Sequence, residues 1–285
     1  MPELPEVEVT RMGLLQHLPN RRIMDIRCGT KQLRKPIPHD LLVQWVHNRR
    51  IFTVERRAKY LLVRMDDGSV LVVHLGMSGS LGLVMAKKPP ALHDHLFLRL
   101  DNELELRYND VRRFGMILVW PAPEATDLEI KFFSRIGPEP FDEKFSPKRL
   151  RRLAARRRQA IKNFLLDQRV VAGIGNIYAN EILFAVGLHP ATPVNEIDET
   201  KWPHLVSCTQ KTLQAAIAMG GTTIADFVDS NGRPGYFQLS LQVYGRAEHA
   251  CRRCLAPIQK IVLGGRSTFF CPQCQPRLSS AETKC

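Results

Sequence analysis

The sequence predicts an α+β protein of several domains, with a β-rich N-terminal part, a helical middle part and a small cysteine-rich tail. Three patterns carry this prediction. Short apolar and alternating runs separated by turns extend from Arg22 to about Trp120, helical periodicity dominates residues 146–230, and two Cys-x-x-Cys pairs follow. The expected parts are a β-sandwich domain at 2–120, a linker at 121–145, a helical domain at 146–240 and a metal-binding tail at 241–285.

The chain is long and strongly basic. Its 285 residues carry 41 Lys and Arg against 28 Asp and Glu, a formal charge of +13, and the isoelectric point is near 9.7. Such a charge favours a polyanionic partner, nucleic acid ahead of an anionic membrane. No apolar run reaches the length of a membrane span, and the acidic N-terminus does not resemble a signal peptide. We therefore expect a cytosolic protein without a membrane partner.

The first residues combine an unusual nucleophile with carboxyl groups. If Met1 is removed, Pro2 becomes a terminal secondary amine, and a pKa near ~8 leaves more of it unprotonated at neutral pH than a lysine near ~10.4. Attack on an aldehyde-level carbon would give a cationic iminium, with Glu3 and Glu6 as candidate proton carriers. The simpler interpretation is a helix start with a proline and acids in its first turn. Both hold together, because a helix over residues 6–18 would keep the amine in place.

The helical part contains two features suited to phosphate. Seven of the eleven residues from 148 to 158 are basic, and in a chain of this charge we favour phosphate contact over a merely solvated helix face. Ser146-Pro147 before them is typical of a helix start. Farther on, Gly173 and Gly175 precede Asn176 and predict a turn that opens a helix, where backbone N–H groups can approach a phosphate.

The tail carries the strongest local pattern. Cys251 and Cys254 form one pair, sixteen residues intervene, and Cys271 and Cys274 form the second pair, which is the spacing of a zinc ribbon. Four thiolates complete a tetrahedral shell, so one Zn²⁺ there would be structural, holding a hairpin too small to fold unaided. The alternative is accidental spacing. The other cysteines are expected to be free thiols: Cys28, Cys208 and Cys285.

Taken together, these features resemble the bacterial formamidopyrimidine-DNA glycosylases from residue 2 to about residue 275. The family's fold is an N-terminal β-sandwich with an N-terminal helix, a helix-two-turn-helix domain and a C-terminal zinc finger. The motifs that carry the resemblance are Pro2-Glu3-Leu4-Pro5-Glu6, Arg57-Ala58-Lys59-Tyr60, His74-Leu75-Gly76-Met77-Ser78-Gly79, Arg112-Arg113-Phe114-Gly115, Gly173-Ile174-Gly175-Asn176-Ile177-Tyr178, Gly220-Gly221-Thr222-Thr223 and the cysteine ribbon with Arg266.

The resemblance implies a role for each matching residue. Pro2 would be the Schiff-base nucleophile, Glu3 the general acid, and Lys59 an active-site group near the lesion and its phosphate. DNA contacts are implied for His93, Arg112, Lys162, Asn176 and Arg266.

A second implied set fills the gap that an everted nucleotide leaves in the duplex. An apolar, planar filler offsets an unstacking cost of a few kcal/mol. Phe114 would wedge between bases, Met77 would fill the void, and Arg112 would donate to the estranged cytosine. The loop after Met219 would close over the flipped base. Each of these residues alone would more simply be a core or surface residue.

The implied activity is that of a bifunctional base-excision-repair enzyme. It would remove 8-oxoguanine and formamidopyrimidines from double-stranded DNA, cleave abasic sites by β,δ-elimination, and act as a monomer associated with the bacterial nucleoid. Two alternatives stay open: an endonuclease VIII-like enzyme for oxidised pyrimidines, which has glycine where this chain has Leu4, and a non-catalytic architectural DNA-binding protein. Three departures from the family pattern leave loop shapes open: Val9, Ala58 and Val111.

Overall fold

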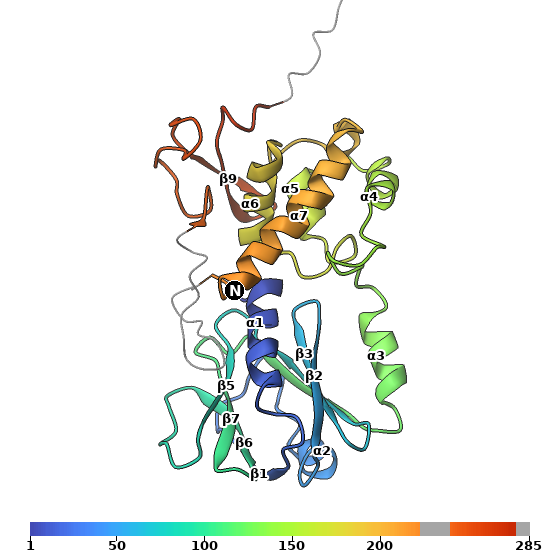
Figure 1. The fold of residues 1–285 in the computed structure, drawn as a ribbon, viewed down its shortest axis with the longest axis vertical. Coiled ribbons are helices and arrows are strands. Elements are labelled where there is room, and N and C mark those ends of the chain that lie inside the picture. Colours follow the sequence, from blue (N-terminus) through green and yellow to red (C-terminus); the bar gives the residue numbers. More distant parts are fainter. Residues whose placement is uncertain (223–239, 278–285) are drawn as a thin grey trace, which may run out of the picture. The chain divides into compact units, whose positions relative to one another are not determined.

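A computed structural model describes residues 1–222 and 240–277 of the chain. The chain divides into two compact units, the first made of residues 1–135 and 216–238 and the second of residues 136–215 and 239–285. None of the helices within the described ranges is long and apolar enough to cross a membrane. The predicted fold class is confirmed, with a β-rich first unit followed by helices and a cysteine-bearing hairpin (Figure 1).

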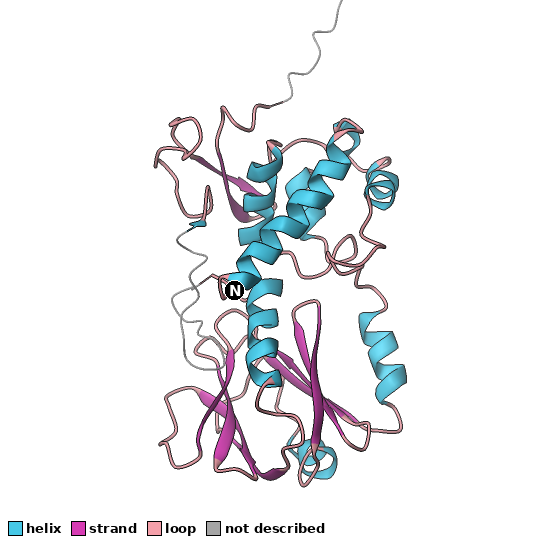
Figure 2. Ribbon diagram, in the orientation of Figure 1, coloured by secondary structure: helices cyan, strands magenta, loops and turns pink. Residues whose placement is uncertain are grey.

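The described part of unit 1 contains two antiparallel four-stranded sheets, whose strands are magenta in Figure 2. The strand orders are β1-β6-β7-β5 and β2-β3-β4-β8. The strands are β1 (Ile23–Cys28), β2 (Ile51–Arg57), β3 (Tyr60–Met65), β4 (Val70–His74), β5 (Ser80–Met85), β6 (Asp94–Leu100), β7 (Leu104–Asn109) and β8 (Met116–Trp120). The helices are α1 (Leu4–Leu15), α2 (His39–Trp45) and α3 (Ala125–Phe133).

One hydrophobic core joins both sheets to α1. Val63 and Val73 come from one sheet and Leu98 from the other, while Leu14 comes from α1, and each side chain is fully buried. Alternation along the strands places these apolar residues on the inner faces, which is the packing of a β-sandwich. Helix α1 thereby becomes part of the core, which holds the helix in place.

Two features of unit 1 were not expected from the sequence. The sequence pattern predicts one run over 51–65 that pairs with residues 70–75 across a turn at 66–68. In the structure residues 51–65 form a hairpin of two strands, because the chain turns between Arg57 and Tyr60. The stretch expected to be a linker contains helix α3. Its Phe133 packs edge-on against Tyr60 and Trp120, with ring centroids 5.6 and 5.9 Å apart. These aromatic contacts bind the helix to the sheet.

Unit 2 begins with the predicted basic helix. Ser146 caps α4, its hydroxyl accepting from the Arg149 N–H at 3.4 Å, and Pro147 is the first helical residue. Helix α6 starts at Asn176 directly after Gly175, as predicted, and ends at Gly187 with a left-handed φ of 75°. The described elements are α4 (Pro147–Ala154), α5 (Ile161–Leu166), α6 (Asn176–Val186), the 3₁₀ helix η1 (Val194–Glu196), α7 (Lys201–Ala218), β9 (Gln259–Leu263) and β10 (Arg266–Phe270).

A glutamine fixes the two turns between α5 and α6. The Gln168 side-chain amide donates to the Ile174 carbonyl at 2.8 Å and accepts from the Gly173 N–H at 2.7 Å. These bonds satisfy backbone groups that lie outside any helix. The glycine turn before α6 is therefore a defined structure that aims the helix N-terminus.

Candidate functional site

The N-terminus is buried directly ahead of α1. Pro2 and Glu3 are both buried, and Glu3 caps the helix with extended backbone angles. The Glu3 N–H donates to Glu6 Oε2 at 2.8 Å, so the helix supplies the acceptor that orders its own first residues. The sequence that predicted a helix start thus also fixes the segment that carries the candidate nucleophile.

Glu6 joins this segment to a distant part of unit 1. Its side chain is fully buried, and Oε1 accepts from the Thr222 N–H at 2.9 Å and from the Thr222 hydroxyl at 2.8 Å. Thr222 follows α7 and the left-handed Gly220 and Gly221. The loop predicted to close over a flipped base starts here, and most of it, at 223–239, lies outside the described residues.

Lys59 lies in the two-residue turn between β2 and β3, and its side chain is 9% exposed. Ala58 beside it has a left-handed φ of 54°. Arg56 Nη1 donates to the Ala58 carbonyl at 3.0 Å, and Arg56 Nε donates to Glu8 Oε2 on α1 at 2.7 Å. This chain of bonds ties the Lys59 turn to the helix that starts behind Pro2.

Burial of the chain terminus favours an unprotonated amine. Burial lowers the pKa of the Met1 amino group, Glu3 and Glu6 oppose this, and the charges of Lys59 and Arg112 lower the pKa further. Four charged groups from α1, the β2–β3 turn and the loop after β7 therefore act on one amine. An amine with a lowered pKa is a nucleophile at neutral pH.

His74 at the end of β4 is kept neutral. Burial lowers its pKa to about 4, and the charges of Lys59 and Arg34 act in the same direction, against Asp110. The ring nitrogen Nδ1 accepts from the Gly76 N–H at 3.1 Å, which only an unprotonated nitrogen can do. His74 therefore shapes the loop that follows β4 and carries no charge near pH 7.

The predicted void-filling residues lie on two neighbouring loops. Pairing of His74 with Met116 brings the loop after β4 beside the loop before β8. Met77 is 37% exposed and Phe114 is 44% exposed, so both large apolar side chains reach the surface. The Arg112 guanidinium lies 5.1 Å from the centre of the Phe114 ring. Met77 and Phe114 therefore form an apolar probe, and Arg112 places hydrogen-bond donors beside it.

In unit 2, two of the predicted DNA-contact residues converge on the hairpin that carries a third. Lys162 Nζ donates to the Ser267 carbonyl at 2.9 Å and Asn176 Nδ2 donates to the same oxygen at 3.0 Å. Lys162 is fully buried, whereas Arg266 is exposed. Arg266 follows a turn at residues 264–265 where both glycines have left-handed φ values of 56° and 74°, the conformation of the tightest hairpin turns.

The remaining predicted contact, His93, lies in unit 1. It is half-buried before β6 and has a left-handed φ of 73°. Its carbonyl accepts from the Asp110 N–H at 3.1 Å. His93 is thereby attached to the base of the loop that carries Arg112 and Phe114.

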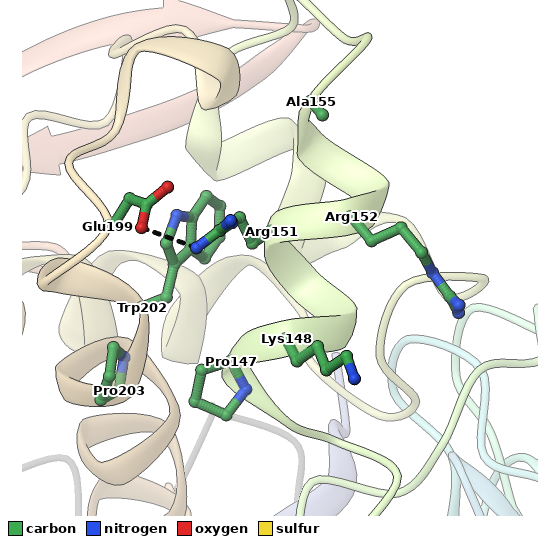
Figure 3. A pocket seen from close by; sticks show the side chains of 8 residues that line it. All are labelled: Pro147, Lys148, Arg151, Arg152, Ala155, Glu199, Trp202 and Pro203. Carbon is green, nitrogen blue, oxygen red and sulfur yellow. Dashed lines mark hydrogen bonds and ion pairs between the residues drawn. The ribbon is translucent and has the colours of Figure 1, made fainter.

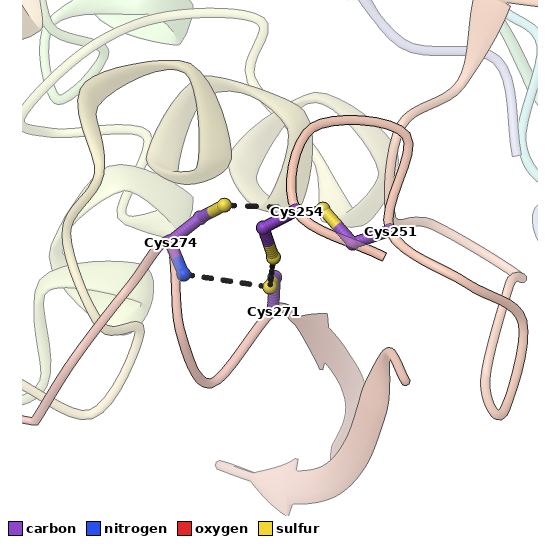
Figure 4. A group of neighbouring side chains, drawn as sticks. All are labelled: Cys251, Cys254, Cys271 and Cys274. Carbon is purple, nitrogen blue, oxygen red and sulfur yellow. Dashed lines mark hydrogen bonds between the residues drawn. The ribbon is translucent and has the colours of Figure 1, made fainter. Parts of the chain in front are cut away.

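The four cysteines of the tail form one cluster (Figure 4). Their sulfur atoms all lie within 4.8 Å of one another, and the Cys254 and Cys271 sulfurs are 3.4 Å apart. Four soft thiolate donors at this spacing fit a tetrahedral Zn²⁺ and leave no position open for a substrate. The cluster is the site of one structural zinc ion that fixes the β9–β10 hairpin.

A hollow of about 620 Å³ lies on unit 2 between α4 and the start of α7 (Figure 3). Its lining residues are Pro147, Lys148, Arg151, Arg152, Ala155, Glu199, Trp202 and Pro203. Arg151 pairs with Glu199 at 2.6 Å, and both are exposed. The basic run predicted from the sequence thus forms a cationic rim on the described surface.

Some residues that connect these groups were not predicted from the sequence. Asp110 was not singled out, although it is fully buried and contacts both void-filling loops. The pairing of Glu8 with Arg56 was also missed. An acid two residues before Arg112 in a candidate loop is a signal that could have revealed Asp110, whereas Glu8 and Arg56 are joined only by the fold.

Comparison with known protein families covers most of the chain. Residues 1–117 match the formamidopyrimidine-DNA glycosylase N-terminal domain, residues 136–228 match the H2TH domain of the same enzymes, and residues 249–277 match the zinc finger found in FPG and IleRS.

Individual relatives agree along almost the whole length. A formamidopyrimidine-DNA glycosylase of Methylococcus capsulatus is 48% identical over 277 residues, which cover 96% of this chain and all of the relative. A Lactococcus lactis Fpg solved with abasic-site DNA is 35% identical with a TM-score of 0.88, covering 96% of this chain and all of the other. A mutant of the L. lactis protein solved with Fapy-dG DNA also has 35% identity and a TM-score of 0.88, at 97% and 100% coverage.

The fold and its cysteine cluster place the protein in the class that joins a β-sandwich, a helix-two-turn-helix unit and a zinc finger. The chain belongs to the formamidopyrimidine-DNA glycosylase family. The resemblance noted from the motifs is thereby confirmed. The roles of individual residues stay predictions.

Proposed function

We propose that the chain is a base-excision-repair enzyme that removes 8-oxoguanine and formamidopyrimidines from duplex DNA and then cleaves the strand at the abasic site. The observation that carries this is the burial of the terminal amine, with Glu3, Glu6, Lys59 and Arg112 acting on its pKa. Family membership supports the same activity. The L. lactis relatives, solved with Fapy-dG DNA and abasic-site DNA, support this substrate class.

The nucleophile in this proposal is the nitrogen of Pro2. Removal of Met1 moves the chain terminus one residue inward, into the buried segment ahead of α1. The Pro2 nitrogen bonds to C1′ and gives up its N–H proton, the glycosidic bond breaks, and the base departs with its electron pair and takes up a proton. The sugar C1′–O4′ bond then opens as Glu3 gives a proton to O4′, which leaves a cationic iminium between Pro2 and C1′.

Strand cleavage follows from the iminium. The positive charge acidifies the C2′ proton, and loss of that proton expels the 3′ phosphate with the electrons of the C3′–O bond. A second elimination expels the 5′ phosphate in the same way. Water then hydrolyses the iminium and restores Pro2. Lys59 supplies positive charge close to the phosphate of the lesion.

Nucleotide eversion is assigned to the two exposed loops of unit 1. We assign Phe114 and Met77 to the emptied stack and Arg112 to the orphaned cytosine, because arginine donors match the O2 and N3 acceptors of that base. The closeness of the Arg112 guanidinium to the Phe114 ring supports this assignment.

DNA affinity is assigned mainly to exposed cations of unit 2. Arg266 at the hairpin turn and the basic rim of α4 are suited to phosphates. Asn176 and His93 are assigned further backbone contacts. The Lys162 ammonium is fully buried and donates to the hairpin, so we assign its charge to supporting Arg266 and the phosphate beside it. The protein acts as a monomer, and we place it in the bacterial cytoplasm at the nucleoid.

The test is reductive trapping of the covalent intermediate. The protein is mixed with a duplex that contains one 8-oxoguanine opposite cytosine, borohydride is added, and the adduct is mapped by mass spectrometry. The expected result is a stable adduct on Pro2. Parallel duplexes with a formamidopyrimidine and with an oxidised pyrimidine rank the lesions and test the alternative specificity.

A pair of proline variants controls the trapping experiment. Pro2→Gly should lose strand cleavage and keep most of its salt-sensitive DNA binding, while Pro90→Gly, the same change at an exposed loop proline, should trap like the parent. The proposal fails if protein shown by mass to lack Met1 gives no adduct with any lesion, or if the adduct maps to another amine.

A further inference from the structure

Asp110, directly after β7, lies between the two void-filling loops and is fully buried. Its Oδ1 accepts from the Ser78 hydroxyl at 2.6 Å and from the Arg112 N–H at 3.3 Å. Its Oδ2 accepts from the Gly115 N–H at 2.8 Å and from the Tyr108 hydroxyl at 3.2 Å. One carboxylate therefore contacts the loop that carries Met77 and both ends of the loop that carries Phe114.

The backbone carbonyl and N–H of Asp110 also form hydrogen bonds. The carbonyl accepts from the Arg113 N–H at 3.3 Å and lies 2.9 Å from Nε2 of the buried His95, and the N–H donates to the His93 carbonyl. Burial and the negative charge of Asp110 raise the pKa of Tyr108, so its hydroxyl remains a proton donor to the carboxylate at neutral pH. The side chain and the backbone of Asp110 together contact polar groups on both loops and on β6.

Close backbone packing adds to these bonds. A β-carbon on Gly115 would collide with the Tyr108 hydroxyl, and one on Gly76 would collide with the Gly115 amide. The two loops therefore touch through their main chains, with no side chain between them. A displacement of one loop must move the other.

We propose that Asp110 is the positioning residue for base eversion, fixing Met77, Arg112 and Phe114 as one rigid probe. The inference rests on the void-filling role proposed above. Exposed side chains on loops would otherwise lose conformational freedom when they enter the duplex, and ordering them beforehand removes that cost from the step in which the base leaves the stack. Asp110 touches neither substrate nor reacting atoms.

The substitution Asp110→Asn tests this role with almost no change in volume. Gly115 and Arg112 present fixed N–H donors to opposite oxygens of the carboxylate. An asparagine has one oxygen and one NH₂ group. If the NH₂ group faces Gly115, that N–H loses its acceptor and this end of the loop is released. If it faces Arg112, that N–H keeps only the Ser78 hydroxyl at 3.0 Å, and the bond between the carboxylate and this end of the loop is lost. Ser78→Ala, by contrast, removes a hydroxyl that also accepts from the Arg112 N–H at 3.0 Å, and leaves both N–H bonds to the carboxylate in place.

The experiment compares two substrates under single-turnover conditions. One duplex contains 8-oxoguanine opposite cytosine, and the other contains a ready-made abasic site, which has no base to unstack. For Asp110→Asn we expect 8-oxoguanine excision to fall about 10- to 100-fold, as for a misplaced functional group. Abasic-site cleavage should change less than about threefold, because the Pro2 chemistry is intact and eversion costs least for a damaged nucleotide. A 2-aminopurine beside the lesion should report slower unstacking.

Matched variants complete the test. Asp101→Asn makes the same change at an exposed aspartate and should behave like the parent, and Ser78→Ala should show a smaller split between substrates than Asp110→Asn. If Asp110→Asn melts below the assay temperature, Ser78→Ala and Tyr108→Phe together must show the split. Equal loss on both substrates, or no loss on either, overturns the positioning role. Failure of the parent on both substrates would overturn the proposed function instead.

Discussion

The N-terminal segment and the C-terminal hairpin are both held by side chains from distant parts of the sequence, but by different forces. Glu6, which is fully buried, joins Glu3 to Thr222 through three hydrogen bonds, and its helix packs into a large apolar core through Val7 and Leu14. The hairpin depends on four thiolates around one metal ion and a small local core. The N-terminal segment should therefore be stable without metal, whereas the hairpin with Arg266 should not.

Loss of zinc should have the largest effect and should be confined to the hairpin. Cys254→Ser should reduce bound zinc from one equivalent to almost none, since a structural zinc ion contributes on the order of 10 kcal/mol to folding of its module. Hydrogen exchange should show lost protection in β9 and β10 and unchanged protection in β3 and β4. Cys28→Ser, which lies outside the cluster, should keep its zinc. If the β9 and β10 amides stay protected in the zinc-free protein, the hairpin does not depend on zinc and the prediction is wrong.

Glu6→Gln should destabilise the N-terminal segment. The carboxylate accepts from two fixed N–H groups, those of Glu3 and Thr222, and a glutamine NH₂ group must face one of them. A buried donor left without an acceptor costs about 1–3 kcal/mol, and we expect the upper end because the lost acceptor is charged. Denaturant unfolding measures the change. Glu143→Gln, at an exposed position, should cost almost nothing, and an equal loss in both variants would contradict the prediction.

Acid should weaken the sandwich through His74. Its pKa is lowered to about 4 in the folded protein, so between pH 6.5 and 4 the unfolded chain binds a proton that the native state does not. Stability is therefore complete above pH 6.5 and falls as the pH drops toward 4, by about 2 kcal/mol at pH 5 for this group. Urea unfolding at pH 5 and pH 8 measures it. In His74→Asn the difference in unfolding free energy between pH 8 and pH 5 should be smaller by about 2 kcal/mol. If the variant shows the same difference as the parent, His74 is excluded as its cause.

Ala58→Gly should give the smallest effect, a gain. Ala58 is held at a left-handed φ of 54°, which costs a residue with a β-carbon roughly 1–2 kcal/mol, and glycine loses part of that gain through its freer unfolded chain. We expect stabilisation of about 0.5–1 kcal/mol, seen as a slightly higher melting temperature. Ala91→Gly, at an exposed loop position without a left-handed φ, should not stabilise. Destabilisation by Ala58→Gly would show that the turn prefers alanine.

The order of the parts could be predicted because it depends on local patterns. Each of these patterns depends on residues that are close together in sequence: the strand alternation, the capped basic helix at Ser146 and the glycine turn before Asn176. The cysteine spacing likewise predicted the zinc cluster. Helix α1 was expected at residues 6–18, but it begins at Leu4, because its first turn contains two residues that precede the apolar period.

Long-range partners could not be predicted in the same way. Helix α3 lies among prolines that indicate a linker, and it is attached to the sheet through Phe133, whose aromatic partners are far away in sequence. The turn at Ala58 was missed because alanine is not a turn residue. Asp110 and Glu6 act through donors that only the fold brings to them.

The bridge between α1 and the Lys59 turn has a consequence for ionic strength. Burial acts to raise the pKa of Glu8, but hydrogen bonds and charges from Arg11 and Arg56 outweigh it and lower that pKa. The Arg56–Glu8 pair is only 10% and 16% exposed, so salt screens it little. DNA binding by exposed cations weakens steeply with salt. Added salt should therefore reduce how often the protein engages a lesion while leaving the single-turnover rate on saturating DNA unchanged.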